Sequence, residues 1–141
     1  MMKHLSKLIC IIIICAIIAI PADALTEASH FFSMESAYLT RTSGTTFAIS
    51  YDVTATGMMD ELGADLVHVE RSSDDSNWST VYTFYDSDRN YMIADNTCDH
   101  ACELYYTGIS GYYYRAYVDF YAHDDGNYGY DGRYTASIYI P

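Results

Sequence analysis

The chain has 141 residues, enough for one domain, and a formal net charge of −12. A surface this acidic repels phosphate backbones and anionic lipid headgroups, which excludes nucleic acid and membrane surfaces as expected partners. Tyrosine is abundant, with 16 residues, whereas proline occurs only twice.

Residues 1–24 are predicted to be a secretory signal peptide. Lys3 and Lys7 precede an apolar run over 8–20, and Ala-Asp-Ala follows at 22–24. The run is shorter than the about 20 residues that a helix needs to span a bilayer. No small residue precedes Cys10 or Cys15, which argues against a lipoprotein signal. We therefore expect cleavage after Ala24, secretion to the cell exterior and no membrane association afterwards.

Residues 25–141 would then form one domain. Cleavage removes two lysines and Asp23, so the remaining chain has no lysine and one more negative charge than the full sequence. Short runs of alternating apolar and polar residues, broken by Gly, Asn, Asp and Ser, predict strands. We expect seven of them, at 31–42, 46–55, 65–71, 78–85, 103–107, 112–123 and 133–140.

The segments between these strands are expected to be loops. Residues 58–66 have the only spacing that resembles a helix, and we expect a loop there with at most one helical turn. Residues 124–132 are rich in Asp, Gly and Asn and form the last predicted loop. Seven short strands at these spacings favour an all-β fold, an antiparallel β-sandwich of the immunoglobulin or fibronectin type III kind.

The longest predicted strand, 112–123, separates its side chains into two faces. The inward face is expected to contain Tyr112, Tyr114, Ala116, Val118, Phe120 and Ala122. Its core partners would be Phe47, Ile49, Val53, Val67, Val69, Ala136, Ile138 and Ile140, with Trp78 at one end of the core. The outward face would present Tyr113, Arg115, Tyr117, Asp119, Tyr121 and His123.

Three blocks of sequence carry a resemblance to a known family. They are ATGMMDELGA at 55–64, VHVERSSD at 67–74 followed by Asn77-Trp78, and YTGISGYYYRAYV at 106–118. Together they resemble a family of short secreted proteins from Gram-positive anaerobes, and the last block also resembles the Tyr-x-Tyr-Arg pattern of fibronectin type III strands. The resemblance implies the same fold and export. The family brings no established activity, so it implies no catalytic residue.

Cys98 and Cys102 are the two cysteines left after the predicted cleavage. A cysteine pair in an exported chain usually forms a disulfide, and we expect one here. A spacing of four residues brings the two Cα atoms within bonding range in a helical turn, but not in an extended strand. Two free thiols and a metal site with His100 are the alternatives. A fourth ligand is missing nearby, so we expect no metal and no cofactor.

Two acidic segments have some of the oxygen-bearing side chains of a calcium-binding loop. Residues 86–90 begin like such a loop, but Tyr91 replaces the required glycine and Thr97 the required glutamate. The last loop also carries four oxygen-bearing side chains: Asp124, Asp125, Asn127 and Asp131. Such residues are common in solvated turns for backbone reasons, and a turn is the preferred interpretation over a calcium site.

The sequence favours a binding protein over an enzyme. His68 and His123 could share the outer face with Glu70 and Asp119, but no nucleophile motif accompanies them, and we assign no catalytic residue. Exposed tyrosines suit interfaces, because each combines an apolar ring with a hydroxyl group. The candidate binding residues are Tyr113, Arg115, Tyr117, Asp119 and Tyr121. Their partner is expected to be a protein or, alternatively, a neutral glycan. A further alternative is that these tyrosines cover a solvent-facing sheet and bind no partner, because tyrosine is common in strands.

Overall fold

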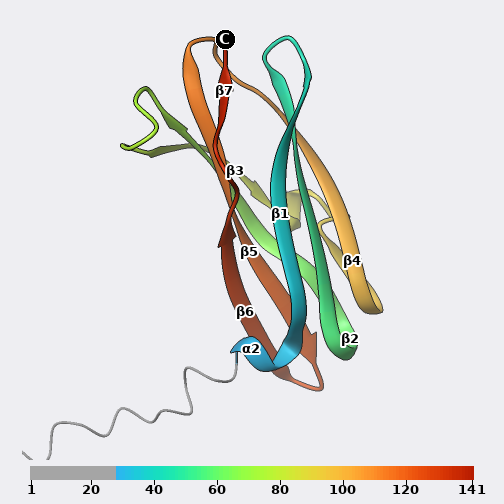
Figure 1. Ribbon diagram of the computed structural model, residues 1–141. Coiled ribbons are helices and arrows are strands. Elements are labelled where there is room, and N and C mark those ends of the chain that lie inside the picture. The colour runs from blue at the N-terminus through green and yellow to red at the C-terminus, as the bar shows by residue number, and fades with distance from the viewer. Residues whose placement is uncertain (1–27) are drawn as a thin grey trace, which may run out of the picture.

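The computed structural model describes residues 28–141, so the predicted signal peptide lies outside the described residues. A short helix α2 (Ala28–Phe31) leads into antiparallel strands that make up most of the described chain (Figure 1). They are β1 (Phe32–Ser43), β2 (Thr46–Ser72), β3 (Ser79–Tyr85), β4 (Ile93–Thr107), β5 (Tyr112–Asp124), β6 (Asn127–Tyr134) and β7 (Ile138–Ile140), with a 3₁₀ turn η2 (Asp86–Asp88). The predicted all-β class is confirmed. No helix within residues 28–141 is long and apolar enough to cross a bilayer.

The long strand β2 joins two strands that the sequence predicted as separate. The predicted loop at 58–66 is wrong, because this segment is extended and paired on both edges. Leu62, for example, pairs with Ala94 of β4 on one side and with Ala122 of β5 on the other. Hydrogen-bonded neighbours on both edges outweigh the weak local preference of this segment.

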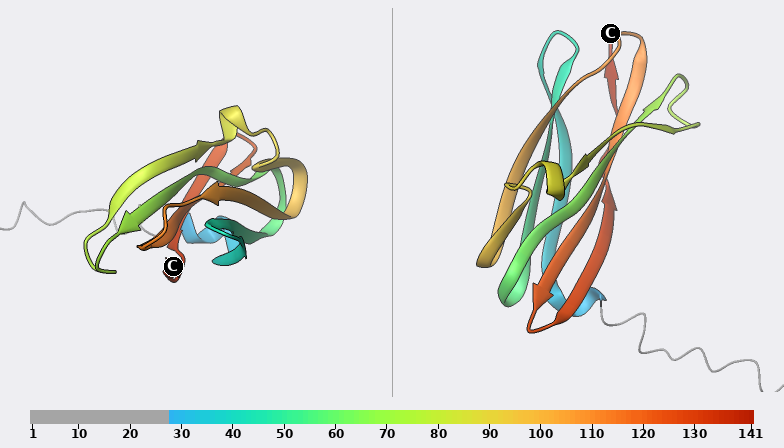
Figure 2. Two further views of the ribbon diagram at one scale, coloured as in Figure 1. Left: turned by 90° about the horizontal axis from the view of Figure 1, so that it is seen from above. Right: turned by 180° about the vertical axis from the view of Figure 1, so that it is seen from behind.

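Because β2 changes its neighbour along its length, the sheet folds over into two layers. The first half of β2 pairs with β1, whereas the second half pairs with β5. We call the two layers the β1–β4 layer (β1, the first half of β2, and 99–107 of β4) and the β5–β6 layer (β3, the second half of β2, β5, β6 and β7). Figure 2 shows the layers from above and the β5–β6 layer from behind. The fold is therefore sandwich-like.

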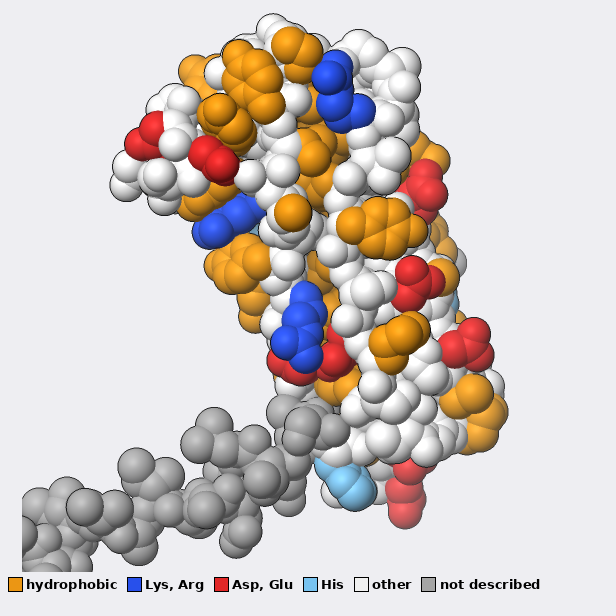
Figure 3. Space-filling model, in the orientation of Figure 1, with side chains coloured by type: hydrophobic (Ala, Val, Ile, Leu, Met, Phe, Trp, Pro, Cys, Tyr) orange, Lys and Arg blue, Asp and Glu red, His pale blue; other side chains and the backbone are white. Residues whose placement is uncertain are grey.

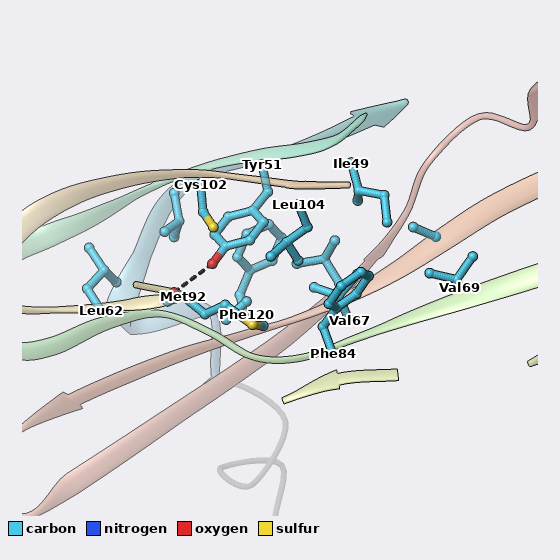
Figure 4. Close-up of a cluster of buried hydrophobic side chains, with 14 of the residues drawn as sticks. Ile49, Tyr51, Leu62, Val67, Val69, Phe84, Met92, Cys102, Leu104 and Phe120 are labelled. Carbon is cyan, nitrogen blue, oxygen red and sulfur yellow. Dashed lines mark hydrogen bonds between the residues drawn. The ribbon is translucent and has the colours of Figure 1, made fainter. Parts of the chain in front are cut away.

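The core lies between the layers, as the alternation of β5 predicted. Tyr114, Ala116, Val118, Phe120 and Ala122 are fully buried. They meet the first half of β2 through ring contacts, with centroids 5.2 Å apart for Phe47–Tyr114 and 5.8 Å apart for Tyr51–Phe120. Figure 4 shows part of this cluster. The other expected partners that are buried are Ile49, Val53, Val67, Val69 and Ile140.

Four of the predicted core residues have a different environment. Tyr112 and Ile138 are only partly buried, at the edge of the core. Ala136 is exposed, because it lies in the irregular segment between β6 and β7. Trp78 is half-buried outside the core, where it contacts Arg115. The interpretation of Trp78 as the end of the core is therefore wrong.

Tyr51 attaches the segment after β3 to the core. Its buried hydroxyl donates to the carbonyl oxygen of Met92, with an O···O distance of 2.6 Å (Figure 4). The same carbonyl accepts from the backbone N–H of Ala64. Burial raises the pKa of Tyr51, so the phenol stays protonated and remains a donor. This bond holds the chain between η2 and β4 against β2.

An ion pair joins the two layers where β1 faces β6. Arg133 Nη2 lies 3.1 Å from Glu35 Oε2 and 3.2 Å from Asp131 Oδ2. The side chain of Glu35 is 8% exposed, and its Oε1 has no hydrogen-bond partner in the described structure. Burial raises the pKa of Glu35, and Asp131 raises it further. The arginine therefore connects a buried carboxyl group of one layer to an edge strand of the other.

Candidate binding surface

The outer face of β5 presents the five residues that the sequence singled out. Tyr113, Arg115, Tyr117, Asp119 and Tyr121 are each half-buried, and they alternate with the buried core residues of the same strand. The predicted parity of β5 is therefore confirmed. Whether these residues bind a partner stays a prediction.

The tyrosines of β5 are in contact with further rings on the neighbouring strands. Tyr113 contacts Tyr139 of β7, and Tyr117 contacts Tyr134 of β6, both with centroids 4.9 Å apart. Tyr121 lies 5.4 Å from Tyr130. Other ring pairs continue these contacts to Tyr128, His68 and His123. We call this set of rings on the β5–β6 layer the aromatic face.

Tyr128 and Tyr130 of β6 were missed because 124–132 was predicted to be a loop, whereas Tyr134 was placed in the predicted strand 133–140. The chain instead turns at Asp125-Gly126 and continues as a strand in which Tyr128, Tyr130 and Tyr134 point to the outer face. These tyrosines stand at alternate positions in the sequence, and this alternation could have indicated a strand. The Asp and Gly residues around them favoured a loop instead.

Gly132 makes room for a ring of the aromatic face. It lies opposite Asp119 in the β5–β6 pairing, next to Tyr117 and Tyr134. A Cβ atom at this position would collide with the hydroxyl group and the ring of Tyr117. The missing side chain therefore lets Tyr117 lie across β6, while His68 stacks on it from β2 with centroids 6.2 Å apart.

Arg115 is held on the aromatic face by an acid and two rings. Its Nε lies 2.6 Å from Glu70 Oε2 of β2. The guanidinium carbon is 4.5 Å from the ring centroid of Trp78 and 4.3 Å from that of Tyr134. The Glu70 side chain is 13% exposed and that of Arg115 27%, so the pair is mostly withdrawn from water. Arg115 therefore fixes the surrounding rings through cation–π contacts.

A pocket of about 480 Å³ opens beside the aromatic face. Tyr121 and Tyr130 line one side, and the segment that follows β3 lines the other. The remaining lining residues come from β2, η2, β4 and the loop before it: Glu61, Asp65, Asp86, Asn90, Ile93 and Asp95. We call it the acidic pocket. Sequence patterns did not indicate it, because its carboxylates come from segments that only the fold brings together.

The acidic pocket is lined by the carboxyl groups of Glu61, Asp65, Asp86 and Asp95, and none of its lining residues is basic. Burial raises the pKa of Asp65, and the carboxylate of Asp86 raises it further. Burial also raises the pKa of Asp119, with Asp65 adding to the effect. The Tyr121 hydroxyl donates to Glu61 Oε2 over 2.8 Å, and burial and this carboxylate together raise the pKa of Tyr121. Burial is the main cause of each raised pKa, and the neighbouring carboxylates add to it.

The two histidines considered for catalysis contact different residues. His68 Nδ1 lies 2.8 Å from the Thr83 hydroxyl oxygen, and His123 Nδ1 lies 3.6 Å from Glu61 Oε2. His68 lies opposite Tyr117 of β5, whereas His123 lies opposite Glu61, further along the same strand. Positions 117 and 123 are about 20 Å apart along an extended strand. The structure therefore does not bring the two imidazoles together.

The predicted disulfide is contradicted by the structure. Cys98 and Cys102 both lie in β4 and are free thiols, Cys98 exposed and Cys102 buried. An extended strand separates the Cα atoms of residues four apart by about 13 Å, well beyond bonding range. The helical turn on which the prediction depended is absent from 93–107 because this segment pairs with β2.

The acidic loop considered for calcium is divided by the fold. Asp124 and Asp125 lie at the β5–β6 turn, where the Asp125 N–H donates to Asp60 Oδ2 over 3.0 Å. Asp131 lies instead along β6 beside Arg133. Asp86 and Asp88 belong to the 3₁₀ turn. Within residues 28–141, no three His, Cys, Asp or Glu side chains converge as metal ligands would.

Comparisons of this chain with protein-family models, with curated proteins and with solved structures found no match.

Proposed function

We propose that this chain is a secreted, non-catalytic binding protein that recognises a protein partner at the cell exterior or envelope through the aromatic face. The observation that carries the proposal is the network of ring contacts that spreads over β5, β6 and β7 on one outer surface. Rings already held by their neighbours lose little conformational freedom on binding, which favours affinity.

The exposure of these rings supports a role in contact with a partner. Tyr128, Tyr130, Tyr134 and Tyr139 are between 46% and 57% exposed, so each presents an apolar ring and a hydroxyl group to the solvent. Contiguous exposed apolar surface with polar groups around it is characteristic of interaction sites. The predicted signal peptide supports the extracellular location.

For the fold, we propose membership of the immunoglobulin-like or fibronectin type III-like sandwiches. The two-layer arrangement of seven antiparallel strands supports this proposal. Domains of this architecture often serve as binding modules, although a fold alone does not determine a function.

A neutral glycan is the second candidate partner. It is favoured by the acidic pocket, where Tyr121 and Tyr130 lie beside carboxylates that could accept hydrogen bonds from sugar hydroxyls. In this role the chain would be a carbohydrate-binding module that uses part of the same surface.

A double variant with a matched control tests the proposal. Tyr134→Ser with Tyr139→Ser removes two exposed rings of the aromatic face, whereas Tyr38→Ser with Tyr105→Ser removes two equally exposed rings of the β1–β4 layer. Peptides selected from a displayed random library on the wild-type protein are then measured against both variants.

We expect the first variant to lose affinity by about tenfold or more and the control to retain it, as expected for aromatic anchors of an interface. Equal affinities in both variants, or a library from which no peptide is enriched, would contradict a protein-binding role. A glycan array probed in parallel with wild type and with Tyr130→Ser, which removes an exposed ring of the acidic pocket, would favour the second candidate if glycan signals are lost in this variant and no peptide is enriched.

A further inference from the structure

Arg115 shows how the aromatic face accommodates a guanidinium group. The side chain lies over the rings of Trp78 and Tyr134 and forms an ion pair with Glu70, so two aromatic rings and one carboxylate surround a single cation. Each of these contacts is favourable for a planar, weakly hydrated cation.

The acidic pocket contains the same kinds of groups on the same face. Tyr121 and Tyr130 provide two rings in contact with each other, and Glu61, Asp65, Asp86 and Asp95 provide carboxylates. None of its lining residues is an arginine or a lysine. Among the ion pairs within residues 28–141, only the contact of His123 with Glu61 involves a carboxylate of this pocket.

The charge of the pocket is complementary to a cation, and its geometry favours an organic one. No three of the acidic side chains described converge as ligands of a metal ion would, so the carboxylates surround a space and do not form a coordination site. A volume of about 480 Å³ is within the range of sites for small ligands. Burial and the neighbouring carboxylate of Asp86 raise the pKa of Asp65, so a positive charge placed beside these two groups would be stabilised.

We propose that the acidic pocket receives an arginine side chain of the protein partner, with the guanidinium group against Tyr121 and Tyr130 and paired with Asp65 and Glu61. The partner is therefore a basic segment, in keeping with a chain whose residues after 24 contain no lysine. This inference rests on the proposed function and adds the chemistry of the ligand.

The test uses a small probe on the purified protein. N-acetyl-arginine amide is titrated into the ¹⁵N-labelled chain, and N-acetyl-citrulline amide, which is nearly isosteric and uncharged, is the matched control probe. We expect the arginine probe to shift amide signals of Asp65, Asp86, Tyr121 and Tyr130 with a dissociation constant of the order of 1 mM, and the citrulline probe to bind at least about tenfold more weakly.

Two variants locate the site. Asp65→Asn with Asp86→Asn is expected to weaken the arginine probe by about fivefold or more, whereas Asp99→Asn, in the exposed part of β4, is expected to leave it unchanged. Equal binding of both probes, equal binding by wild type and the pocket variant, or shifts confined to other regions would overturn the inference.

The outcome is separable from that of the proposed function. Tyr134 and Tyr139 do not line the pocket, so a partner that depends on them but not on Asp65 and Asp86 would leave the aromatic face as the binding surface and remove only the arginine site.

Discussion

The two outer surfaces of this sandwich-like fold use tyrosine in different ways. On the β1–β4 layer, Tyr38 and Tyr105 lie on the two edge strands, and small residues such as Ala48 and Ser50 lie between them. In Figure 3, which looks onto β1, the hydrophobic side chains over that strand stand apart, with polar atoms between them. On the β5–β6 layer the rings contact one another from strand to strand. The difference shows that exposed tyrosines occur on both layers, and that the contacts between neighbouring rings, not the tyrosine content, set the β5–β6 layer apart.

Gly132→Ala gives the largest expected effect on the aromatic face. The added Cβ would overlap the ring and hydroxyl of Tyr117, which is confined by His68 and Tyr134. We expect the free energy of unfolding, measured by urea denaturation, to fall by about 2 kcal/mol. Gly57→Ala is the control, because nothing lies within 4 Å of its added Cβ, and its change should remain within about 0.5 kcal/mol. Similar values for both variants would show that the rings are not tightly packed.

Arg115→Leu should have a somewhat smaller effect. It leaves the mostly buried Glu70 carboxylate without its ion pair and removes the contacts with Trp78 and Tyr134. We expect a loss of about 1.5 kcal/mol in the free energy of unfolding. Arg41→Leu, on the exposed surface of β1, should change it by less than about 0.5 kcal/mol. If adding Glu70→Leu to the first variant restores no stability, the unpaired carboxylate is not the cause.

Asp65→Asn should change how the stability of the protein depends on pH, whereas a substitution of an exposed aspartate on β4 should not. In the folded state the pKa of Asp65 is raised above its ordinary value of 3.8. Protonated Asp65 therefore favours folding, and this stabilisation is lost as the pH rises through the folded pKa. The variant should therefore be the more stable chain at pH 7, by less than about 1 kcal/mol, and lose this advantage as the pH falls toward 3.8.

Thermal melts of wild type and variant measure this effect. They are recorded from about pH 3.5 to about pH 7, a range that includes the ordinary pKa of an aspartate. Asp99→Asn removes the same charge from β4, so subtracting its values corrects for the change in net charge. If the difference in stability between Asp65→Asn and wild type is constant over this range, the pKa of Asp65 is not raised in the folded state.

Cys98→Ser, on β4, should have the smallest effect. Because both cysteines are free and Cys98 is exposed, the free energy of unfolding should change by less than about 0.5 kcal/mol. A disulfide over so short a loop would contribute roughly 2 kcal/mol. Alkylation of the folded protein should modify Cys98 quickly and Cys102 slowly, and a thiol count of zero would restore the bridge that the strand geometry contradicts.

The sequence predicted best where a strand alternates without interruption. In β5 each inward position is apolar or aromatic and each outward position polar or aromatic, so Tyr114 in the core and Tyr117 outside were both predicted correctly. Local sequence did not predict the conformation where contacts with neighbouring strands determine it. Residues 58–66 contain Gly63 and a helix-like spacing, and only pairing with β4 and β5 makes them a strand.

Contacts between distant segments were beyond sequence patterns. Glu35 and Arg133 are 98 residues apart, and nothing local marks them as partners. The carboxylates of the acidic pocket likewise come from β2, η2 and β4. Each looks like an ordinary surface acid in its own segment, so their common site appears only after the sheet has folded.

The most direct test of the aromatic face as the recognition surface is a map of chemical-shift changes for the ¹⁵N-labelled protein bound to a library-selected peptide. We expect the changes to lie on β5, β6 and β7, around Tyr117, Tyr134 and Tyr139. Changes gathered instead around Tyr38 and Tyr105 of the β1–β4 layer would contradict it.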